Sequence, residues 1–560
     1  MSLTQVTYSM ISGPVVNATD FGAVGDGIAD DTAALNAFFA AVSGKHGLIP
    51  AGTYKITSRI NLPTLTNCTI TGVPGQTTIT GSFGYSLVLA VEMSNVHWYG
   101  IEFNSAYNNA VDGSLNNGVF MQDSFDCINV SIRQCKFTSP LGNAQGLSFF
   151  NRTNAIGTDT CVINGLWIED NIFENIGSIA CVIYNRQETS DKYDAATRVY
   201  FNRNLGKNLG ILQTNTKGFL VSLDGFGSQF TVDYNDVDNP NGIGIENTGW
   251  VKGSLSYNTF RNFGGVGRRC RAMSVADSSV TYPVYELTVI GNKCIDPATN
   301  KSYASFCSDS YFAGNSWAQT GTGIGSESGF TFFDSSRNKV FGDIYSSDQS
   351  YAVRFQSTTG TCQGNVVHAA QFDTSASAAN VAVINFDGAA TSGNVVFGSL
   401  AKGTGGAFVT NTNSAANNET GYDATGSGNL GVTFAVAGNL NFAGTTPFKW
   451  TRKGNLCTVS FAIDSTTFTH TTASSFLRLT GLPFTVASGD ESGLGAMSAV
   501  QGITKANYTQ FGVRAFAGQT YMLIYASGSG QNAALIQASD MPSGGTLALY
   551  GSVTYFVQDT

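Results

Sequence analysis

The middle of the chain, roughly residues 95–410, is a series of short runs in which apolar and polar residues alternate. Residues 285–290 (Tyr-Glu-Leu-Thr-Val-Ile) and 242–245 (Gly-Ile-Gly-Ile) show this two-residue period, which indicates β-strands and not helices. The runs are closed by asparagines that have an apolar residue two places further on. These are Asn171, Asn235, Asn258, Asn292, Asn315, Asn338, Asn365 and Asn394. The pattern predicts a train of short strands with a turn at each asparagine.

The spacing of these asparagines indicates a solenoid. Three gaps are identical, since 258 − 235, 315 − 292 and 338 − 315 each give 23 residues, and others run to 27, 29, 34 or more. A repeat of this length with variable insertions and three short strands predicts a parallel β-helix of stacked coils. Asparagines stacked at one turn would hydrogen-bond from coil to coil. The alternative is an ordinary β-sandwich with asparagines in its turns. A sandwich predicts hairpin signals about every 8–12 residues and does not explain the 23-residue spacing.

The N-terminal region predicts a cap for the first coil. Residues 1–16 form a short leader, and a glycine-rich turn follows. A short helix comes next, for which Asp30 is a good N-cap and Gly44 a natural stop. The apolar face of this helix consists of Ala34, Leu35, Phe38, Phe39 and Val42. We therefore expect residues 17–94 to form the cap and first coils, with the helix covering the open edge of the solenoid.

The last part of the chain differs in character. Residues 411–433 are polar and glycine-rich, which predicts a linker or a thinning end of the solenoid. Strand signals separated by turns then recur at residues 457–463, 476–479, 511–515, 521–525 and 547–555. This spacing predicts an antiparallel β-sandwich over residues 434–560. The sequence therefore predicts an all-β protein in which a parallel β-helix over residues 95–410 lies between a small helical cap and a C-terminal sandwich.

Charge and cysteine content narrow the classes of partner. The net charge of −9 disfavours binding to nucleic acid. The ten cysteines include no Cys-x-x-Cys pair and lie in apolar runs, so they predict buried free thiols formed in a reducing cytoplasm. The four histidines lie far apart, so we expect no metal site and no cofactor. Apolar runs of about 18 residues and a signal peptide are both missing, which predicts no membrane insertion and no ordinary secretion.

A motif near the N-terminus carries a family resemblance. It comprises Asp20-Phe21-Gly22-Ala23, Gly25-Asp26-Gly27 and Asp30-Asp31-Thr32-Ala33-Ala34, followed by Ile49-Pro50-Ala51-Gly52-Thr53-Tyr54. In this motif the chain resembles pectate-lyase-3-type right-handed β-helices. That type is common in bacteriophage tailspikes that depolymerise bacterial surface polysaccharides. The resemblance implies that the solenoid is right-handed and that its ligand is a capsular or O-antigen polysaccharide.

The resemblance also implies an assembly and a location. Tailspikes of this type usually pack three parallel solenoids, so we expect a homotrimer that contacts other phage tail proteins. The protein would belong to the virion tail, act outside the cell and be assembled in the host cytoplasm. In similar proteins the C-terminal domain holds the trimer together or binds glycan. Because catalytic residues vary among tailspikes, the resemblance carries over no active-site positions.

Candidate catalytic groups are carboxylates at the ends of five successive coils. In Gly-Ile-Gly-Ile-Glu246 and Gly-Ile-Gly-Ser-Glu327, alternation turns the glutamates outward if the isoleucines point inward. The two coils between them end in Asp277 and Asp309, and the coil before them ends in Asp224. We therefore expect one column of carboxylates along the outside of one sheet. The alternative is that they are solvated surface groups at strand ends, where aspartate favours turns.

The distance between coils makes the column a candidate active site. Coils stack about 4.8 Å apart, so Glu246 and Asp277 on adjacent coils suit the 5–5.5 Å pair of a retaining glycosidase. Glu246 and Asp309 would lie two coils or about 9.6 Å apart, near the upper end of the inverting range. Like charges in a column would raise some of the pKa values, as a general acid requires. We expect Glu246 and Asp277, with Asp309 next, to be catalytic, and Asp224 and Glu327 to bind substrate.

Two insertions flank this face and predict further substrate contacts. One contains Tyr184 and Arg186, and the other contains Arg269 and Arg271. Guanidinium groups pair with the carboxylates of acidic sugars, and aromatic rings stack on sugar faces. Trp250, just after the Glu246 segment, is a candidate for sugar stacking. The alternatives are salt bridges at a trimer interface for the arginines and packing for the tryptophan.

These features leave several functions open. The first is an endo-acting glycoside hydrolase that uses two carboxylates. Its variant is a lyase on a uronate-containing glycan, in which a base removes the proton α to the uronate carboxylate and an arginine stabilises the developing charge. The second is an adhesin that binds surface glycan without cleaving it. A plant-wall pectinase is disfavoured because the sequence shows no secretion signal.

Overall fold

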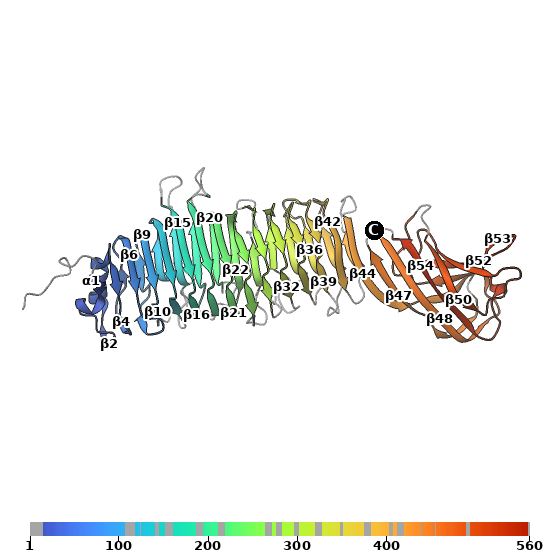
Figure 1. Cartoon of the computed structure of the whole chain (residues 1–560), viewed down its shortest axis with the longest axis horizontal. Coiled ribbons are helices and arrows are strands. Elements are labelled where there is room, and N and C mark those ends of the chain that lie inside the picture. The colour runs from blue at the N-terminus through green and yellow to red at the C-terminus, as the bar shows by residue number, and fades with distance from the viewer. Residues whose placement is uncertain are drawn as a thin grey trace, which may run out of the picture. The chain divides into compact units, whose positions relative to one another are not determined.

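In the computed structural model the chain forms two compact units, residues 1–394 with 403–418 and residues 395–402 with 419–560. The structure describes residues 15–106, 118–123, 125–139, 145–151, 161–185, 193, 195–210, 219–263, 271–275, 283–295, 302–319, 328–347, 351–373, 382–402, 407–411, 419–436, 438–453, 455–488 and 493–557. The first unit is a right-handed parallel β-helix, so the predicted fold is confirmed (Figure 1).

The coils of the β-helix build three parallel sheets. The first sheet contains β5 (Ile60–Asn61), β8 (Val88–Ala90), β11 (Gly118–Asp123), β14 (Gln145–Asn151), β17 (Cys181–Asn185), the first parts of β20 (Val221–Asp233) and β22 (Ile243–Val251), β25 (Arg271–Val275), β29 (Ser302–Ser305), β33 (Ser328–Phe333), β36 (Tyr351–Gln356), β40 (Ala382–Asp387) and β43 (Ala407–Asn411). The second sheet contains β1 (Val15–Asn17), β3 (His46–Leu48), β6 (Leu65–Thr71), β9 (Met93–Tyr99), β12 (Cys127–Arg133), β15 (Ile163–Glu169), β18 (Ala196–Asn202), the end of β20, β23 (Ser254–Ser256), β27 (Thr288–Ile290), β31 (Tyr311–Ala313), β34 (Lys339–Phe341) and β38 (Val366–His368). The third sheet contains β2 (Asp26–Asp30), β4 (Gly52–Ile56), β7 (Thr77–Gly81), β10 (Glu102–Ser105), β13 (Lys136–Ser139), β16 (Ile172–Ile176), β19 (Leu205–Leu209), β21 (Asp236–Pro240), β24 (Thr259–Arg261), β28 (Lys293–Cys294), β32 (Ser316–Gln319), β35 (Ile344–Ser347) and β39 (Gln371–Asp373).

Two short pairs of strands lie at the corner between the first and second sheets. They are β26 (Val284–Tyr285) with β30 (Cys307–Ser308), and β37 (Cys362–Gln363) with β41 (Thr391–Ser392). They lengthen the path between the first and the second sheet in these coils. Residues in these added strands therefore lie on the corner and not on the outer face of the first sheet.

Apolar side chains stack from coil to coil inside the solenoid. The rings of Phe103, Phe137, Phe173 and Phe201 are buried, and successive ring centroids lie 5.4, 5.2 and 5.9 Å apart. Because each coil places its phenylalanine over that of the preceding coil, offset stacking adds to the burial of apolar area. The alternation of the sequence therefore becomes one continuous core along the axis.

Buried asparagines form the ladder that the sequence predicts. Its members are Asn171, Asn204, Asn235, Asn258, Asn292, Asn315 and Asp343. At Asn258, the Nδ2 group donates to the Oδ1 atom of Asn292 (2.9 Å) and to the carbonyl oxygen of Val232 (2.8 Å). The backbone N–H of each member also donates to the side chain of the next coil, as from Asn235 to Asn258 (3.0 Å). The ladder thus satisfies buried backbone groups at the corner between the second and third sheets.

The last three asparagines of the sequence pattern belong to a different ladder. Asn338, Asn365 and Asn394 bond to one another at the corner where the chain enters the second sheet. The 23-residue gap between Asn315 and Asn338 therefore joins two columns and is not one coil. In the first ladder the partner of Asn315 is Asp343, 28 residues further on. The sequence pattern also missed Asn204, because the residue two places after it is Gly206 and not an apolar side chain.

A helical cap precedes the coils, as predicted. Helix α1 (Thr32–Val42) follows the 3-10 turn η2 (Ala18–Phe21), and Leu35, Phe38, Phe39 and Val42 are fully buried beneath it. The N-cap residue is Asp31 and not Asp30. The Asp31 carboxylate accepts the backbone N–H groups of Val24 (2.6 Å) and Gly25 (3.1 Å), which fixes the glycine-rich turn of the motif.

Asp30 has a separate role at the start of the cap. Its carboxylate accepts hydrogen bonds from the Thr32 and Thr57 side chains, which hold the pKa of Asp30 at about 2. Thr57 follows β4, so this contact ties the helix to the third sheet.

The second unit consists of antiparallel strands, as predicted for the C-terminal region. Its elements are β42 (Val395–Lys402), β44 (Glu419–Asn429), β45 (Gly431–Val436), β46 (Leu440–Thr445), β47 (Pro447–Lys453), β48 (Leu456–His470), β49 (Ser474–Thr480), β50 (Leu494–Gln501), β51 (Gln510–Ala515), β52 (Tyr521–Gly528), β53 (Gln531–Leu535), η3 (Ala538–Asp540) and β54 (Leu547–Phe556). One parallel pair, β42 with β44, accompanies them.

The linker expected over residues 411–433 is wrong for residues 419–433. Strands β44 and β45 occupy this stretch and pair with β47 and β49. The misleading glycines have a packing role, because Gly426 lies opposite Trp450 and a Cβ atom there would be 2.5 Å from the indole ring. Glycine in this strand makes room for an aromatic ring from the neighbouring strand.

Candidate active site on the first sheet

The outer face of the first sheet carries two columns of outward side chains in the coils of β17, β20 and β22. The pairing of the strands gives both columns directly. Val182, Ser222, Glu246, Ser274 and Tyr303 form the inner column. Tyr184, Asp224 and Thr248 form the outer column, two residues further along each strand. The sheet therefore brings two of the predicted carboxylates, Asp224 and Glu246, onto adjacent coils.

The separation of Asp224 and Glu246 follows from this pairing. Glu246 lies opposite Ser222, and Asp224 is two residues beyond Ser222 on the same strand. One coil step of about 4.8 Å and two residues of about 3.3 Å each place the two positions about 8 Å apart along the diagonal. The carboxyl groups of inverting glycosidases lie about 6.5–9.5 Å apart, so backbone positions with this spacing are compatible with such a pair.

Hydroxyl groups hold both carboxylates in place. Ser222 donates its hydroxyl to Oε2 of Glu246 (2.7 Å), and Thr248 donates its hydroxyl to Oδ1 of Asp224 (2.9 Å). Each donor lies directly across from its acceptor on the neighbouring coil. Both carboxylates are half-buried, so they are partly shielded from water while still accessible from the outer face.

An apolar wall adjoins the carboxylates on the same sheet. It consists of Met121, Phe150, Ile179, Val182, Phe219 and Ile243, with Leu89 and Tyr184 packed against it. Tyr184 lies directly beside Asp224 in the outer column, and its ring meets Phe150 edge-on with centroids 5.9 Å apart. The predicted substrate-binding role of Tyr184 is compatible with this position. An apolar wall beside a carboxyl group favours its neutral form, which a general acid needs.

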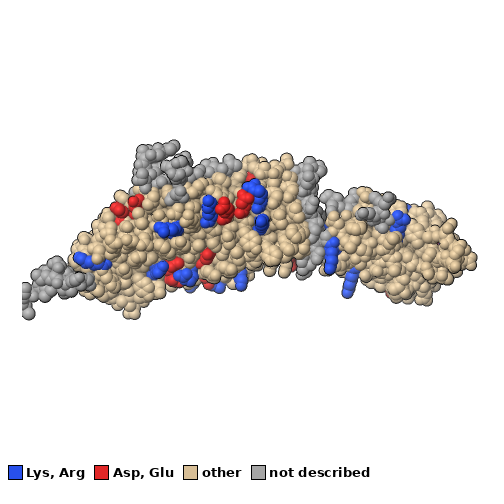
Figure 2. All heavy atoms as spheres, turned by 45° about the horizontal axis from the view of Figure 1, so that its top comes forward, with Lys and Arg blue, Asp and Glu red and all other residues tan. Residues whose placement is uncertain are grey.

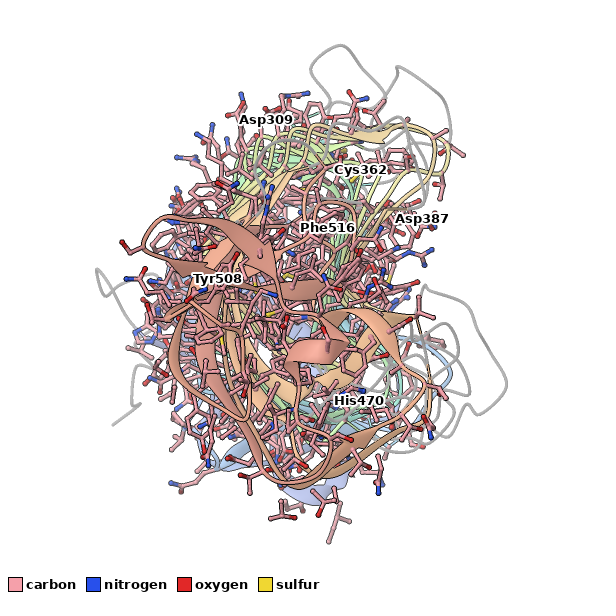
Figure 3. The ribbon with its side chains drawn as sticks, turned by 90° about the vertical axis from the view of Figure 1, so that its right-hand side faces the viewer. Asp309, Cys362, Asp387, His470, Tyr508 and Phe516 are labelled. Atoms are coloured by element: carbon pink, nitrogen blue, oxygen red, sulfur yellow. The ribbon has the colours of Figure 1, made fainter. Side chains whose placement is uncertain are left out.

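Asp309 does not lie where the sequence analysis places it. Two coils beyond Glu246, the same column holds Tyr303 and not Asp309. Asp309 lies past β30, on the corner between the first and second sheets, and its side chain points outward there (Figure 3). Arg337 donates to both of its carboxylate oxygens (2.7 and 2.6 Å), which lowers the pKa of Asp309. The expected two-coil pair of Glu246 and Asp309 is therefore wrong.

Trp250 cannot stack on a sugar, contrary to prediction. Its side chain is fully buried inside the solenoid, where the ring meets Phe230 edge-on with centroids 5.8 Å apart. The alternation of side chains does not predict this orientation, because β22 turns the corner between two sheets and directs Trp250 inward. The indole N–H donates to the carbonyl oxygen of Asp224 (3.5 Å), so Trp250 supports the strand that carries this carboxylate.

Several predicted site residues cannot be placed. Asp277, Glu327, Arg186 and Arg269 lie outside the residues that the structure describes. Arg271 begins β25, where its backbone lies opposite Ile243, and its side chain is outside the description. Their predicted roles in catalysis and substrate binding stay predictions.

Charged side chains on the other two sheets form ion pairs between coils. Glu169 on the second sheet contacts Arg133 (3.0 Å) and Arg203 (3.4 Å). Glu174 on the third sheet lies between Lys136 and Lys207, and the hydrogen bond from Lys136 lowers its pKa. Figure 2 shows charges of both signs side by side in small groups along the solenoid. These contacts tie the coils of the second and third sheets together.

The described residues contain no group of three or more His, Cys, Asp or Glu side chains that could hold a metal ion. The nine described cysteines carry free thiols, and all but Cys161 are buried. Burial raises the pKa of Cys135, Cys294 and Cys362 to about 12, so these thiols are unreactive. The buried free thiols predicted from the sequence are confirmed for this set. In the described part of the chain, no helix is long and apolar enough to cross a membrane.

The two hydroxyl donors, Ser222 and Thr248, were not predicted from the sequence. Ser222 and Asp224 alternate on β20, and Glu246 and Thr248 alternate on β22. Each strand thus offers one hydroxyl and one carboxylate on the same face, in opposite order. This reversed order was present in the sequence as Ser-Leu-Asp and Glu-Asn-Thr, but its meaning depends on the pairing of the strands.

Three of the solved structures that match this chain are bacteriophage proteins. The pre-mature gene product 12 of bacteriophage phi29 matches with a TM-score of 0.52 at 14% identity, over 72% of this chain and 55% of that chain. The Dettilon tailspike protein matches with a TM-score of 0.40 at 15% identity, over 96% and 94% of the two chains. Tailspike protein 3 of bacteriophage CBA120 matches with a TM-score of 0.43 at 10% identity, over 72% and 61%. At these identities the likeness to the phi29 protein concerns the fold.

Sequence comparison gives a more specific relationship for the first part of the solenoid. No curated protein sequence matches the chain. Residues 15–251, which include the N-terminal motif, β20 and both carboxylates, match the family model described as rhamnogalacturonase A/epimerase, pectate lyase-like. The resemblance to pectate-lyase-type β-helices that the motif predicts is thereby confirmed, and over these residues the chain is similar to the pectate-lyase-like family.

Proposed function

We propose that this protein is a phage tailspike that binds a bacterial capsular or O-antigen polysaccharide and cleaves it by endo-glycosidic hydrolysis. Asp224 and Glu246 are the proposed catalytic pair. The observation that carries the proposal is their diagonal placement on adjacent coils of the first sheet, with backbone positions about 8 Å apart. The sequence predicts Asp277 as the partner of Glu246, and Asp277 stays an alternative candidate to Asp224.

The separation of the pair indicates an inverting mechanism. One carboxyl group, in its protonated form, gives its proton to the oxygen of the leaving sugar. The other, as a carboxylate, removes a proton from a water molecule that attacks the anomeric carbon from the opposite face. A spacing of about 8 Å leaves room for that water between the carboxylate and the sugar. Ser222 and Thr248 position the two groups, because each hydroxyl donates to one carboxylate oxygen.

The ligand class and the assembly rest on similarity. The N-terminal motif resembles that of tailspikes that depolymerise polysaccharide, and residues 15–251 match a family named for enzymes of pectic polysaccharides. A homotrimer that contacts other phage tail proteins in the virion tail is part of the same proposal. Among the described residues, the catalytic pair lies within one chain, so cleavage does not require a neighbouring subunit to supply a carboxylate.

The proposal is tested by release of reducing ends from purified capsular polysaccharides. The substitutions Asp224→Asn and Glu246→Gln should each lower the rate about 10²- to 10⁴-fold, the usual contribution of a general acid or base. Asp238→Asn is the matched control, because this carboxylate lies on β21 of the third sheet and accepts a hydrogen bond from Asn262 (2.7 Å). Full activity in both site variants would remove the pair from the mechanism.

The family match also favours a second candidate, a lyase. In that reaction Tyr184, beside Asp224, would take the proton α to a uronate carboxylate. The products would carry a new double bond that absorbs in the far ultraviolet, which hydrolysis products lack. Tyr184→Phe would abolish a lyase reaction and leave hydrolysis by the carboxylates largely intact. Binding of the polysaccharide with neither reducing ends nor new absorbance would identify an adhesin.

A further inference from the structure

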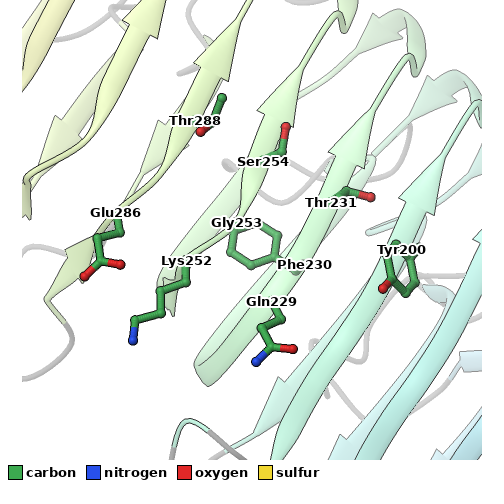
Figure 4. Close-up of a pocket in the computed structure, with 9 residues that line it drawn as sticks. All are labelled: Tyr200, Gln229, Phe230, Thr231, Lys252, Gly253, Ser254, Glu286 and Thr288. Carbon is green, nitrogen blue, oxygen red and sulfur yellow. The ribbon is translucent and has the colours of Figure 1, made fainter.

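A second hollow lies on the outer face of the second sheet, away from the catalytic columns. Strand pairing gives the order of its central column. From coil to coil the outward residues are Trp167, Tyr200, Thr231, Ser254, Thr288 and Tyr311. Three small hydroxyl side chains therefore follow Tyr200 on successive coils (Figure 4), and Tyr311 comes after them. Because three successive coils carry small side chains at this position, the face has a hollow with a volume of about 530 Å³.

An aromatic ring closes one end of this hollow, and a second ring lies one coil beyond the other end. Tyr200 is stacked on Trp167 at one end, with ring centroids 5.4 Å apart and planes 9° from parallel. Its other face points toward the short side chain of Thr231, so no ring of the central column covers it. Tyr311 lies one coil beyond Thr288, the last lining residue of the central column, and is 41% exposed. From Tyr200 to Tyr311 there are four coil steps, or about 19 Å, which suits a short oligosaccharide.

Polar side chains form one rim of the hollow. Gln229, Lys252 and Glu286 lie on successive coils, and all three have a left-handed backbone with φ between 54° and 56°. Such a conformation is uncommon for residues other than glycine or asparagine and turns these side chains out at the corner. Lys252 and Glu286 carry opposite charges on neighbouring coils, so the rim has amide, ammonium and carboxylate groups without a net charge.

The floor of the hollow is shaped by packing beneath it. Gly253 lies between Lys252 and Ser254, and a Cβ atom there would be 2.3 Å from the ring of Phe230. Glycine therefore lets the backbone lie directly on the buried ring. Asp233, beside the hollow, accepts the hydroxyl of Ser254 (2.8 Å) and the backbone N–H of Ser256 (2.7 Å), and burial raises its pKa. These contacts make a rigid hollow with a hydroxyl-lined floor.

We propose that this hollow is a second carbohydrate-binding site, which holds a neutral segment of the polysaccharide without cleaving it. A sugar presents C–H faces and hydroxyl edges. The hollow offers the ring face of Tyr200 at one end and hydroxyl and amide groups along its length, with Tyr311 one coil beyond its other end. The balanced rim gives no preference for an acidic chain. Glu286 is the one carboxylate among the described residues that line the hollow, so the two-carboxylate arrangement of a glycosidase is missing there.

The site adds a function to the proposed cleavage and takes its ligand class from it. The hollow lies on the second sheet, whereas Asp224 and Glu246 lie on the first, so the same polymer can be held at one place and cut at another. Binding at two linked sites lengthens the residence time of a long polysaccharide far more than that of a short fragment, which reaches one site at a time. We therefore expect the hollow to matter for polymer and not for short fragments.

The test measures binding of the full-length protein and its Glu246→Gln variant to immobilised bacterial surface polysaccharides, with neutral and uronate-containing members. Tyr200→Ala removes one stacking face, and Ser254→Trp fills the middle of the hollow. Each should weaken binding to neutral polymer at least about threefold to tenfold, as expected for loss of one stacked ring. Tyr85→Ala is the matched control, because Tyr85 is an exposed tyrosine (46%) of the first coils whose ring contacts that of Phe83 at a tilt of 46°. Unchanged thermal unfolding shows that the variants fold.

The outcomes separate this inference from the proposed function. Wild-type binding in both Tyr200→Ala and Ser254→Trp would overturn the second site, whatever the result for cleavage. Weaker binding of uronate-containing polymer alone would also overturn it, since the ligand would then be acidic. If Glu246→Gln cleaves at the wild-type rate, the role of Glu246 in catalysis fails, while a loss of binding in Tyr200→Ala still supports the hollow. Cleavage of short oligosaccharides should stay at the wild-type rate in both hollow variants.

Discussion

The asparagine ladder allows a prediction whose size follows from the structure. We consider Asn258→Ala, in the middle of the ladder. The Asn258 side chain is fully buried and makes four hydrogen bonds. Its Oδ1 atom accepts both the backbone N–H (3.0 Å) and the Nδ2 group (2.9 Å) of Asn235. Alanine supplies neither acceptor nor donor, so two N–H groups of Asn235 lose their partner inside the solenoid.

The cost can be estimated from those two groups. A buried donor left without a partner costs about 1–3 kcal/mol, so the pair costs about 2–6 kcal/mol. The carbonyl oxygen of Val232 and Oδ1 of Asn292 each lose one donor as well, and Asn292 still accepts the backbone N–H of residue 258 (3.0 Å). We therefore take the two donors as the larger part of the effect. The ladder beyond the adjacent coils should keep its bonds, because repeat proteins couple mainly through nearest neighbours.

Hydrogen–deuterium exchange at the amide of residue 235 measures this cost where it arises. At about 1.4 kcal/mol per factor of ten, exchange should accelerate roughly 30-fold to 10⁴-fold. Asn61→Ala is the control, because Asn61 is exposed and accepts one hydrogen bond from Arg59 (3.1 Å), and its effect should stay within about 0.5 kcal/mol. An unchanged exchange rate at residue 235 would refute the view that the ladder satisfies buried backbone groups.

Two further predictions concern the end of the ladder and the support of the site. Burial raises the pKa of Asp343 to about 6 from 3.8, so the folded state binds its proton more tightly than the unfolded chain. Stability from this group is full below pH 3.8 and is lost as the pH rises through 6, a change of about 3 kcal/mol. Urea unfolding should show this loss for the wild type, while Asp343→Asn removes it. The second prediction concerns Gly227, where a Cβ atom would lie 2.5 Å from the Trp250 ring. Gly227→Ala should therefore lower the free energy of unfolding by about 1–3 kcal/mol, measured by thermal unfolding. Gly512→Ala is the control and should cost less, because the nearest atom to a Cβ there is 3.4 Å away.

The fold could be predicted because its determinants repeat. Alternation gives the strands, and asparagines at similar spacing give the coils, since each coil must meet the same hydrogen-bonding need at the same corner. The helix α1 was predictable for a similar reason, because its large apolar residues all lie on its buried face. Residues 419–433 were misjudged because glycine and polar residues are typical of linkers. In β44 the glycines instead make room for Trp450 and Phe448, and that need arises on another strand.

The site was only half predictable, and the reason lies in the unequal lengths of the coils. Alternation correctly turned Asp224 and Glu246 outward, but which residues become neighbours depends on how many residues each coil contains. From Ser222 the column advances by 24 residues to Glu246, by 28 to Ser274 and by 29 to Tyr303. Asp309 lies six residues beyond the column position, a distance of about 20 Å if the chain were extended. A sequence shows that a carboxylate ends a strand-like run, but it does not show whether the run ends on the sheet or on the corner after it. In this protein β30 adds such a corner, and that addition separates Asp309 from Glu246 while leaving Asp224 beside it.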